Sequence, residues 1–162
     1  MRVLLLLKVA LLSDWKLTVV YYFRARELGV KDPLLEFSIG VAYLHRAMQR
    51  QADNRHILIL QGMTFIFQYY RSYYERSYSY PGKEGAAMQQ QAEYNVGRSF
   101  HQLGLTTYAI WYYEKVIRIS DEMGGLGVRD LMYEGVHNLC LIYAMAGNMA
   151  AAKATTEKYL VL

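Results

Sequence analysis

One pattern of small and aromatic residues recurs along this chain, and it constrains the fold more than any other feature. The pattern is a small residue, an aromatic residue three positions later, and a glycine four positions after that. It stands at Gly97, Phe100 and Gly104, and again 43 residues later at Cys140, Tyr143 and Gly147. Around both sets, apolar residues recur at spacings of three and four, as on one face of an amphipathic helix. A short turn then leads into a second helix that must pack antiparallel to the first, so the repeated unit is a helical hairpin.

Two earlier units match parts of this pattern once insertions are allowed. Gly40 and Tyr43 match the first-helix positions at an offset of 57 residues, and all offsets fit a 34-residue repeat with two insertions. We expect hairpins at residues 3–28, 34–76, 87–120 and 130–160, with insertions at 45–58, 77–86 and 121–129. The second hairpin is predicted to be elongated, with helices at 34–50 and 57–74 and Asp53 as the N-cap of the latter. The glycine-rich insertion at 121–129 is interpreted as a mobile linker.

Composition supports a helical, intracellular protein. Only Pro33 and Pro81 are present among 162 residues, so helix breakers are rare. Cys140 is the single cysteine, which excludes an internal disulfide framework and favours a reducing compartment. The net charge of +4 permits an acidic partner without requiring one. Residues 3–12 are apolar, but Lys8 interrupts them and no cleavage site follows, so we expect a core helix rather than a signal peptide or membrane span.

The small residues allow the two helices of a hairpin to approach closely, and the aromatic residues fill the space between hairpins. The structural positions of this pattern are Gly40, Tyr43, Gly97, Phe100, Gly104, Ala109, Tyr113, Cys140, Tyr143, Gly147 and Ala152. The pattern resembles the tetratricopeptide repeat (TPR) family. That resemblance implies an all-α, right-handed solenoid of about four antiparallel hairpins, with the second one elongated.

A repeat solenoid offers a concave surface lined by the first helix of each hairpin. The residues predicted to line it are Phe37, Val41, His45, Tyr94, Asn95, Arg98, His101, His137, Asn138 and Leu141. Some TPR proteins hold a terminal carboxylate with Lys and Asn side chains. The comparable positions of this chain do not hold that set of residues, so we do not expect this kind of carboxylate binding. We therefore expect a mixed aromatic and apolar groove for an extended or helical segment of another subunit.

A second candidate surface is rich in arginine and tyrosine. Its members are Arg46, Arg50, Arg55, Arg71, Tyr73 and Arg76. Interleaved Arg and Tyr could stack on nucleic acid and pair with its phosphates. The same residues are enriched at protein interfaces, and their spacing of three and four is also that of helix packing. We favour protein contact or packing over direct nucleic-acid binding.

The sequence contains no recognisable catalytic or metal-binding motif. His137 and Cys140 share a helix face, but two ligands do not make a zinc site. Residues 124–127 are glycine-rich, yet they lack the Lys-Ser/Thr that follows in a phosphate-binding loop. We expect no enzyme activity, no cofactor, no metal and no small-molecule substrate.

Two segments carry a closer resemblance. Residues 38–56 (SIGVAYLHRAMQRQADNRH) and 92–105 (AEYNVGRSFHQLGL) are similar to the C-terminal repeat region of the TPR subunit of TFIIIC, the general factor that assembles RNA polymerase III on its promoters. The resemblance implies a nuclear, non-catalytic scaffold and a chain that is part of a longer protein. Its implied partners are other TFIIIC subunits and TFIIIB components, with mainly indirect DNA contact. A TPR scaffold of another large nuclear or cytosolic complex, and a direct nucleic-acid-binding repeat, remain as alternatives.

Overall fold

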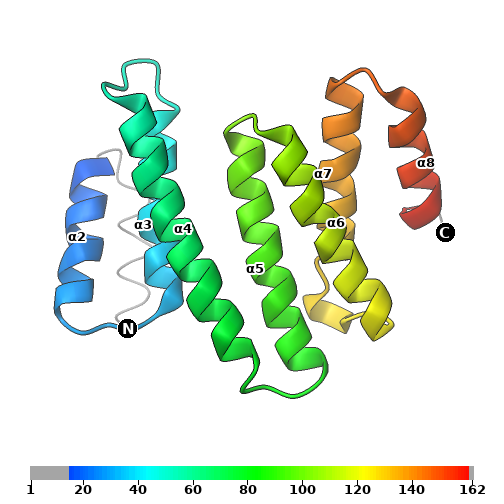
Figure 1. Cartoon of the computed structure of the whole chain (residues 1–162), viewed down its shortest axis with the longest axis horizontal. Helices are drawn as coiled ribbons and strands as arrows, with labels where there is room; N and C mark the ends of the chain where they lie inside the picture. The colour runs from blue at the N-terminus through cyan, green and yellow to red at the C-terminus, as the bar shows by residue number, and fades with distance from the viewer. Residues whose placement is uncertain (1–14, 161–162) are drawn as a thin grey trace. The chain divides into compact units, whose positions relative to one another are not determined.

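The computed structural model describes residues 15–160, and the regular elements in this range are all helical. They are α2 (Trp15–Glu27), α3 (Pro33–Ala47), α4 (Arg55–Ser77), α5 (Lys83–Gln102), α6 (Thr106–Met123), the short 3-10 helix η1 (Gly127–Arg129), α7 (Met132–Met145) and α8 (Met149–Tyr159). This confirms the predicted all-α, TPR-like fold (Figure 1). The first helix of the predicted hairpin 3–28 lies outside the described residues. Within residues 15–160, no helix is both long and apolar enough to cross a membrane.

The chain divides into two compact units, residues 1–72 and 73–162, with the boundary inside α4. In unit 1, the start of α3 is set by Asp32 and Pro33. The Asp32 side chain accepts a hydrogen bond of 3.1 Å from the Leu34 N–H, and Pro33 stands at the first helical position, where its lack of an N–H costs nothing. The core between α2 and α3 is built from buried Tyr22, Leu35 and Ile39.

In unit 1, α3 and α4 come unusually close to one another at two glycines. A Cβ atom on Gly40 would lie 2.8 Å from Ile66 Cδ1 and 2.9 Å from the carbonyl oxygen of Gly62. A Cβ on Gly62 would in turn lie 2.7 Å from the Leu44 side chain. Both glycines are therefore needed for the helices to reach this separation, and Gly62 is a partner that the repeat pattern did not predict.

Ring contacts along the same pair of helices show that they run antiparallel. Phe37 packs on Tyr69 with centroids 4.9 Å apart, and Tyr43 stacks on Phe65 at 5.9 Å. As residue numbers rise along α3, the numbers of their partners on α4 fall. This is the elongated hairpin that the sequence predicted.

The predicted ends of these helices differ from the observed ones by a few residues. The helix expected at 34–50 spans Pro33–Ala47, and the one expected at 57–74 spans Arg55–Ser77. The prediction of Asp53 as N-cap is wrong. Helix α4 begins at Arg55, so the residue directly before the helix, which is the N-cap position, is Asn54. Asn54 has a positive φ of 53°, a conformation that asparagine tolerates better than most residues.

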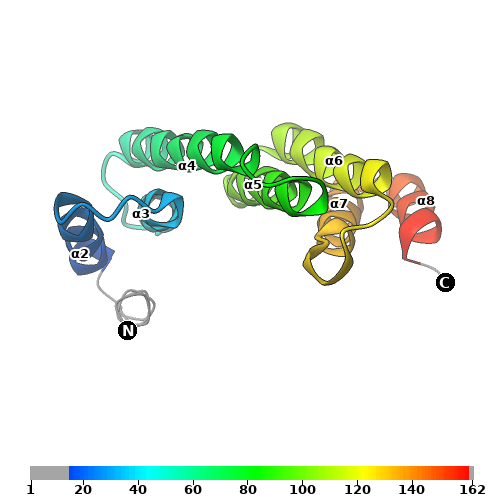
Figure 2. The ribbon, with the colours of Figure 1, turned by 90° about the horizontal axis from the view of Figure 1, so that it is seen from below.

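Unit 2 contains two antiparallel helix pairs, α5 with α6 and α7 with α8. Figure 2 shows α5 and α7 on the same side of α6. The equivalent turns of the two pairs contain Gly104 and Gly147, whose φ angles of 75° and 76° favour glycine. The core joins α6 and α7 through Ala109, Tyr113, Ile117, Val136, Leu139 and Ile142.

Small residues mark two close approaches in unit 2. A Cβ on Gly97 of α5 would lie 3.0 Å from the Tyr113 ring on α6, and one on Gly135 of α7 would lie 3.1 Å from Val116 on α6. Cys140, expected at such an approach, is only partly buried, and its Sγ lies 3.3 Å from Thr156 Oγ1 on α8. Ala152, also on α8, is buried. Gly135, which the repeat pattern did not single out, thus marks the contact of α7 with α6 of the neighbouring hairpin, whereas Cys140 faces α8, the second helix of its own hairpin.

The segment between α6 and α7 is an ordered connection, so its interpretation as a mobile linker is corrected. Helix α6 continues to Met123, and Gly124 ends it in the left-handed conformation with φ 61°. The Leu126 side chain is buried, and the Leu126 N–H donates a 2.9 Å hydrogen bond to the Asp130 carboxylate. Glycines allow these turns, but the carboxylate that follows them holds the segment in place.

Candidate partner-binding face

A buried glutamine and a carboxylate set the position of α7 relative to α5 and α6. The Gln90 side chain, which is fully buried in α5, donates to the carbonyl oxygen of Val116 (3.1 Å) and to Asp130 Oδ1 (2.8 Å). Its own oxygen accepts a 2.8 Å hydrogen bond from the Leu131 N–H. One side chain thus joins α5, α6 and the start of α7.

Asp130 completes this network from the other side. It accepts hydrogen bonds from the Ser120 hydroxyl and from the N–H groups of Leu126 and Met132. Burial alone would raise the pKa of Asp130, but these hydrogen bonds and that of Gln90 favour the carboxylate and hold its pKa below the usual value. No periodic signal in the sequence marks Gln90 and Asp130, because the two residues stand 40 positions apart.

Helices α5 and α7, which this network connects, border a hollow of about 280 Å³. Arg98, His101 and Gln102 line it from α5, at spacings of three and four that place them on one helical face. Asn138 lines it from α7, and Tyr113 reaches it from α6. Three of these five residues, Arg98, His101 and Asn138, were predicted to line the groove.

Tyr94 lies beside this hollow and connects its walls. The Asn138 amide donates a 3.3 Å hydrogen bond to the Tyr94 hydroxyl, and the Arg98 guanidinium carbon lies 5.9 Å from the centroid of the Tyr94 ring. The Tyr94 and Tyr113 rings contact one another at 5.9 Å. Tyr94 therefore supports both the cation on α5 and the amide on α7.

Burial shifts the pKa values of the two titratable rings that line the hollow, in opposite directions. His101 Nδ1 lies 3.3 Å from the Tyr113 hydroxyl oxygen, and burial lowers the pKa of His101 below its ordinary value. Burial raises the pKa of Tyr113, so its hydroxyl stays protonated at neutral pH. The hollow therefore carries one full positive charge near neutral pH, that of Arg98.

The remaining residues predicted for the groove have varied positions. His137 and Leu141 are exposed on α7, and Val41 and His45 are exposed on α3 of unit 1. Asn95, by contrast, is only 9% exposed and faces the interior of unit 2, and Phe37 packs against Tyr69. The hollow of unit 2 is lined by the ring of Tyr113 and by polar side chains, and no aliphatic side chain is among its lining residues.

The residues of the predicted basic and aromatic surface do not form one patch. Arg46, Arg50 and Arg55 lie at the connection between α3 and α4, and Arg46 donates there to Gln49 Oε1 at 2.6 Å. Arg71 lies 16 residues after Arg55 on the same helix, about 24 Å away at the rise of an α-helix. In unit 2, Arg76 lies in the last turn of α4, and the Tyr73 hydroxyl donates to Gln91 Oε1 at 2.9 Å.

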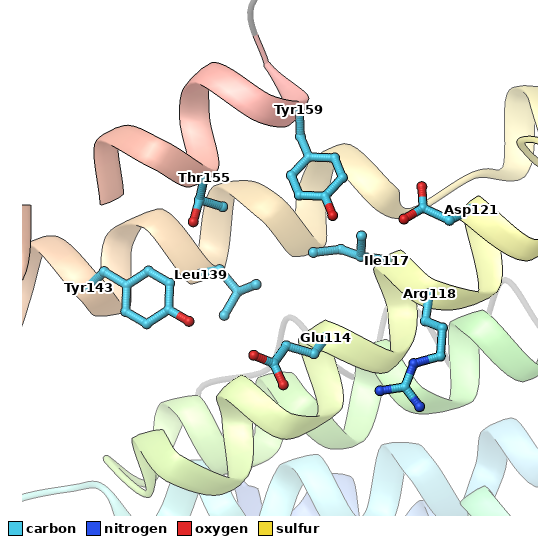
Figure 3. A pocket seen from close by; sticks show the side chains of 8 residues that line it. All are labelled: Glu114, Ile117, Arg118, Asp121, Leu139, Tyr143, Thr155 and Tyr159. Carbon is cyan, nitrogen blue, oxygen red and sulfur yellow. The ribbon is translucent and has the colours of Figure 1, made fainter. Parts of the chain in front are cut away.

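A second hollow of about 320 Å³ lies between α6, α7 and α8. Figure 3 shows its apolar floor of Ile117 and Leu139, with Glu114, Arg118 and Asp121 along the α6 side. Tyr143, Thr155 and Tyr159 complete the lining. Burial raises the pKa of Tyr143, and the Glu114 carboxylate adds to this effect. Both signs of charge meet here, so the charge pattern selects no particular ligand.

Among residues 15–160, no cluster of three or more His, Cys, Asp or Glu side chains could hold a metal ion.

Three curated proteins are similar to this chain over most of its length. They are the transcription factor tau subunit sfc4 of Schizosaccharomyces pombe (38% identical, over 91% of this chain), the transcription factor tau 131 kDa subunit of Saccharomyces cerevisiae (34%, over 86%) and the human general transcription factor 3C polypeptide 3 (33%, over 91%). The chain is homologous to a segment of TFIIIC subunits. It spans 15%, 12% and 16% of their respective lengths. No protein-family model matches the chain.

This similarity confirms the predicted resemblance to TFIIIC subunits. The relatives are named as transcription factor subunits, not as enzymes.

Proposed function

We propose that this chain is a non-catalytic protein–protein interaction segment within TFIIIC, which helps to assemble promoter-bound subunits and to recruit TFIIIB for RNA polymerase III initiation. The observation that carries the proposal is the similarity to three TFIIIC subunits over most of the chain. The partners are other TFIIIC subunits and TFIIIB components. No cofactor or small-molecule substrate is required for this role.

The face bordered by α5 and α7 is the surface that best suits such a partner. It combines the hollow around Arg98 with exposed side chains on α7, including Leu141, which is 43% exposed. A partner segment there could bury apolar area on α7 and meet polar groups in the hollow, the usual mixture of a protein interface. Direct nucleic-acid binding has less support, because Arg46, Arg50 and Arg55 lie around the connection between α3 and α4, whereas Arg71 lies 16 residues after Arg55 along α4.

The proposal is tested by co-purification. The chain, carrying an affinity tag, is incubated with nuclear extract, and TFIIIC subunits and TFIIIB components are quantified in the eluate. Leu141→Glu should lower their recovery several-fold, because a carboxylate would have to be buried against the partner. Leu105→Glu is the matched control, because Leu105 is 44% exposed at the turn before α6.

The proposal fails if a folded chain, checked by circular dichroism, recovers neither TFIIIC subunits nor TFIIIB components. Equal losses with Leu141→Glu and Leu105→Glu would show that the α5–α7 face is not the interface.

A further inference from the structure

We infer that the outer face of α4 in unit 1 binds an acidic amphipathic helix of a partner protein. This inference rests on the proposed role in protein binding, but it concerns a different surface from the α5–α7 face. It is carried by an exposed apolar stripe on α4 and by the arginines around the connection that precedes this helix.

An apolar stripe runs along the side of α4 that faces away from α3. Ile57, Leu60 and Phe67 are 44%, 67% and 41% exposed. Together with the exposed Thr64 they follow spacings of three, four and three, which place them on one helical face. We call these four residues the outer stripe. Contact with α3, made at Gly62, accounts only for the opposite side of the helix.

This part of α4 lacks the charges that a solvent-facing helix carries. Residues 57–70 contain no Asp, Glu, Lys or Arg. By contrast, α6, the equivalent second helix of the next hairpin, carries five such side chains. A surface helix of a globular protein normally presents polar or charged residues opposite its buried face. A continuous exposed apolar stripe is instead typical of a surface that another protein segment covers.

The spacing of the outer stripe selects a helix as the occupant. Its positions alternate by three and four, as the a and d positions of a coiled coil do. Ile57 and Phe67 are ten residues apart, which is about 15 Å along the helix axis. A partner helix of about three turns with its own apolar a and d residues would cover this length.

Positive charge at one end of the outer stripe selects an acidic partner. The connection between α3 and α4, with the helix ends that it joins, holds Arg46, Arg50 and Arg55 against one acidic residue, Asp53. Arg46 donates to Gln49 Oε1 at 2.6 Å and so fixes the connection. Arg50 and Arg55 are exposed. Glutamate or aspartate on a helix that passes the start of α4 would complement this charge.

The same observations disfavour two other occupants. Phosphates of nucleic acid would match the arginines, but they would leave the apolar side chains of the outer stripe in water. A second copy of this chain would bring the same arginines and a net charge of +4 to the interface. An acidic amphipathic helix matches both the outer stripe and the arginines.

The test uses the purified chain and a fluorescein-labelled 21-residue peptide, followed by fluorescence anisotropy. The peptide has leucine at the a and d positions of each heptad and glutamate at e and g, and repulsion between the glutamates keeps it from pairing with itself. A second peptide with lysine at e and g is the control for charge. The native chain should bind the glutamate peptide about tenfold more tightly than the lysine peptide.

Substitutions locate the binding surface, and circular dichroism checks that each variant is folded. Leu60→Glu should weaken binding of the glutamate peptide by about thirtyfold, because an apolar contact is lost and like charges meet. Leu28→Glu is the matched control, because Leu28 is 84% exposed after α2 and gains the same charge. Arg55→Gln should weaken binding by about threefold, the effect of one exposed ion pair. Arg24→Gln, which removes an exposed arginine of α2, is its control.

Several results would overturn the inference. Equal binding of the two peptides would show that charge does not select the partner, and equal losses with Leu60→Glu and Leu28→Glu would show that the outer stripe is not the site. If the native chain is a dimer that Leu60→Glu dissociates, the occupant is a second copy. If a 20-base-pair DNA duplex displaces the peptide and this depends on Arg55, the surface belongs to nucleic acid. Because the experiment uses no nuclear extract and leaves Leu141 unchanged, a failure here is distinct from a failure to recover TFIIIC subunits.

Discussion

The α3–α4 pair of unit 1 and the α5–α7 group of unit 2 are built from similar helices but are held together by different means. In unit 1, Gly40 and Gly62 let two helices approach until aliphatic side chains and backbone touch. In unit 2, the buried Gln90 and the partly buried Asp130 connect three helices by hydrogen bonds. One repeat pattern therefore accommodates both an apolar contact and a polar network, and these two kinds of contact differ in their sensitivity to substitution and to pH.

The largest expected effect is on the glycine contact. Gly40→Val should destabilise unit 1 by about 3 kcal/mol, because the new atoms would overlap Ile66 and the Gly62 carbonyl, and the backbone carbonyl cannot move aside easily. Urea unfolding gives the magnitude, and hydrogen exchange of residues 33–72 gives the location. Gln61→Val, at an exposed position of α4, is the control. Similar losses from both variants would mean that the close approach does not limit the packing.

A smaller effect is expected when the polar network of unit 2 is broken. Asp130→Ala should cost about 2 kcal/mol, because the N–H groups of Leu126 and Met132 lose this acceptor and the Gln90 amide loses one of its two. Hydrogen exchange should accelerate in residues 124–135, and residues 33–72 should be unaffected. Asp121→Ala, on the exposed side of α6, serves as the control. If exchange in residues 124–135 stays slow, the network does not order this connection.

The smallest effect is a dependence on pH that should distinguish the two units. The pKa of Asp130 is lowered in the folded state, so the unfolded chain binds more protons at moderately acid pH. The stabilisation by Asp130 is thus fully present above the ordinary pKa of an aspartate, about 4, and is lost as pH falls through the lower folded-state value. The stability gap between the native chain and Asp130→Asn should therefore shrink between pH 6 and pH 3.

Urea unfolding at a series of pH values measures this gap, and Asp121→Asn shows how the other acidic groups behave. A gap that stays constant, or widens towards acid, would contradict the assignment of the carboxylate form to Asp130.

Much of the fold could be predicted because helical hairpins leave local signals. Apolar spacing, the turn glycines Gly104 and Gly147, and the small residues Gly40 and Gly97 are all visible within short windows of the chain. Helix ends were less predictable, since the start of α4 after Asn54 depends on a single backbone conformation. The linker was misread because glycines signal freedom of the backbone, whereas Asp130 removes that freedom through contacts outside the window.

The candidate site was only partly predictable for a related reason. Helical spacing places Arg98, His101 and Gln102 on one face of α5, and periodicity alone can establish this. It cannot show that Asn95 turns inward, that Phe37 packs on Tyr69, or that Asn138 meets Tyr94. Those facts depend on the angle at which neighbouring helices cross and on the side chains between them.

The fold class, the hairpin repeat and the similarity to TFIIIC subunits follow from local periodicity and residue identity, so they can be inferred from the sequence alone. Which polar groups meet depends on how the helices pack in three dimensions. The hydrogen bond between Gln90 and Asp130 and the hollow around Arg98 join side chains about 40 residues apart. Such pairs are selected by packing in three dimensions and leave no periodic trace along the chain.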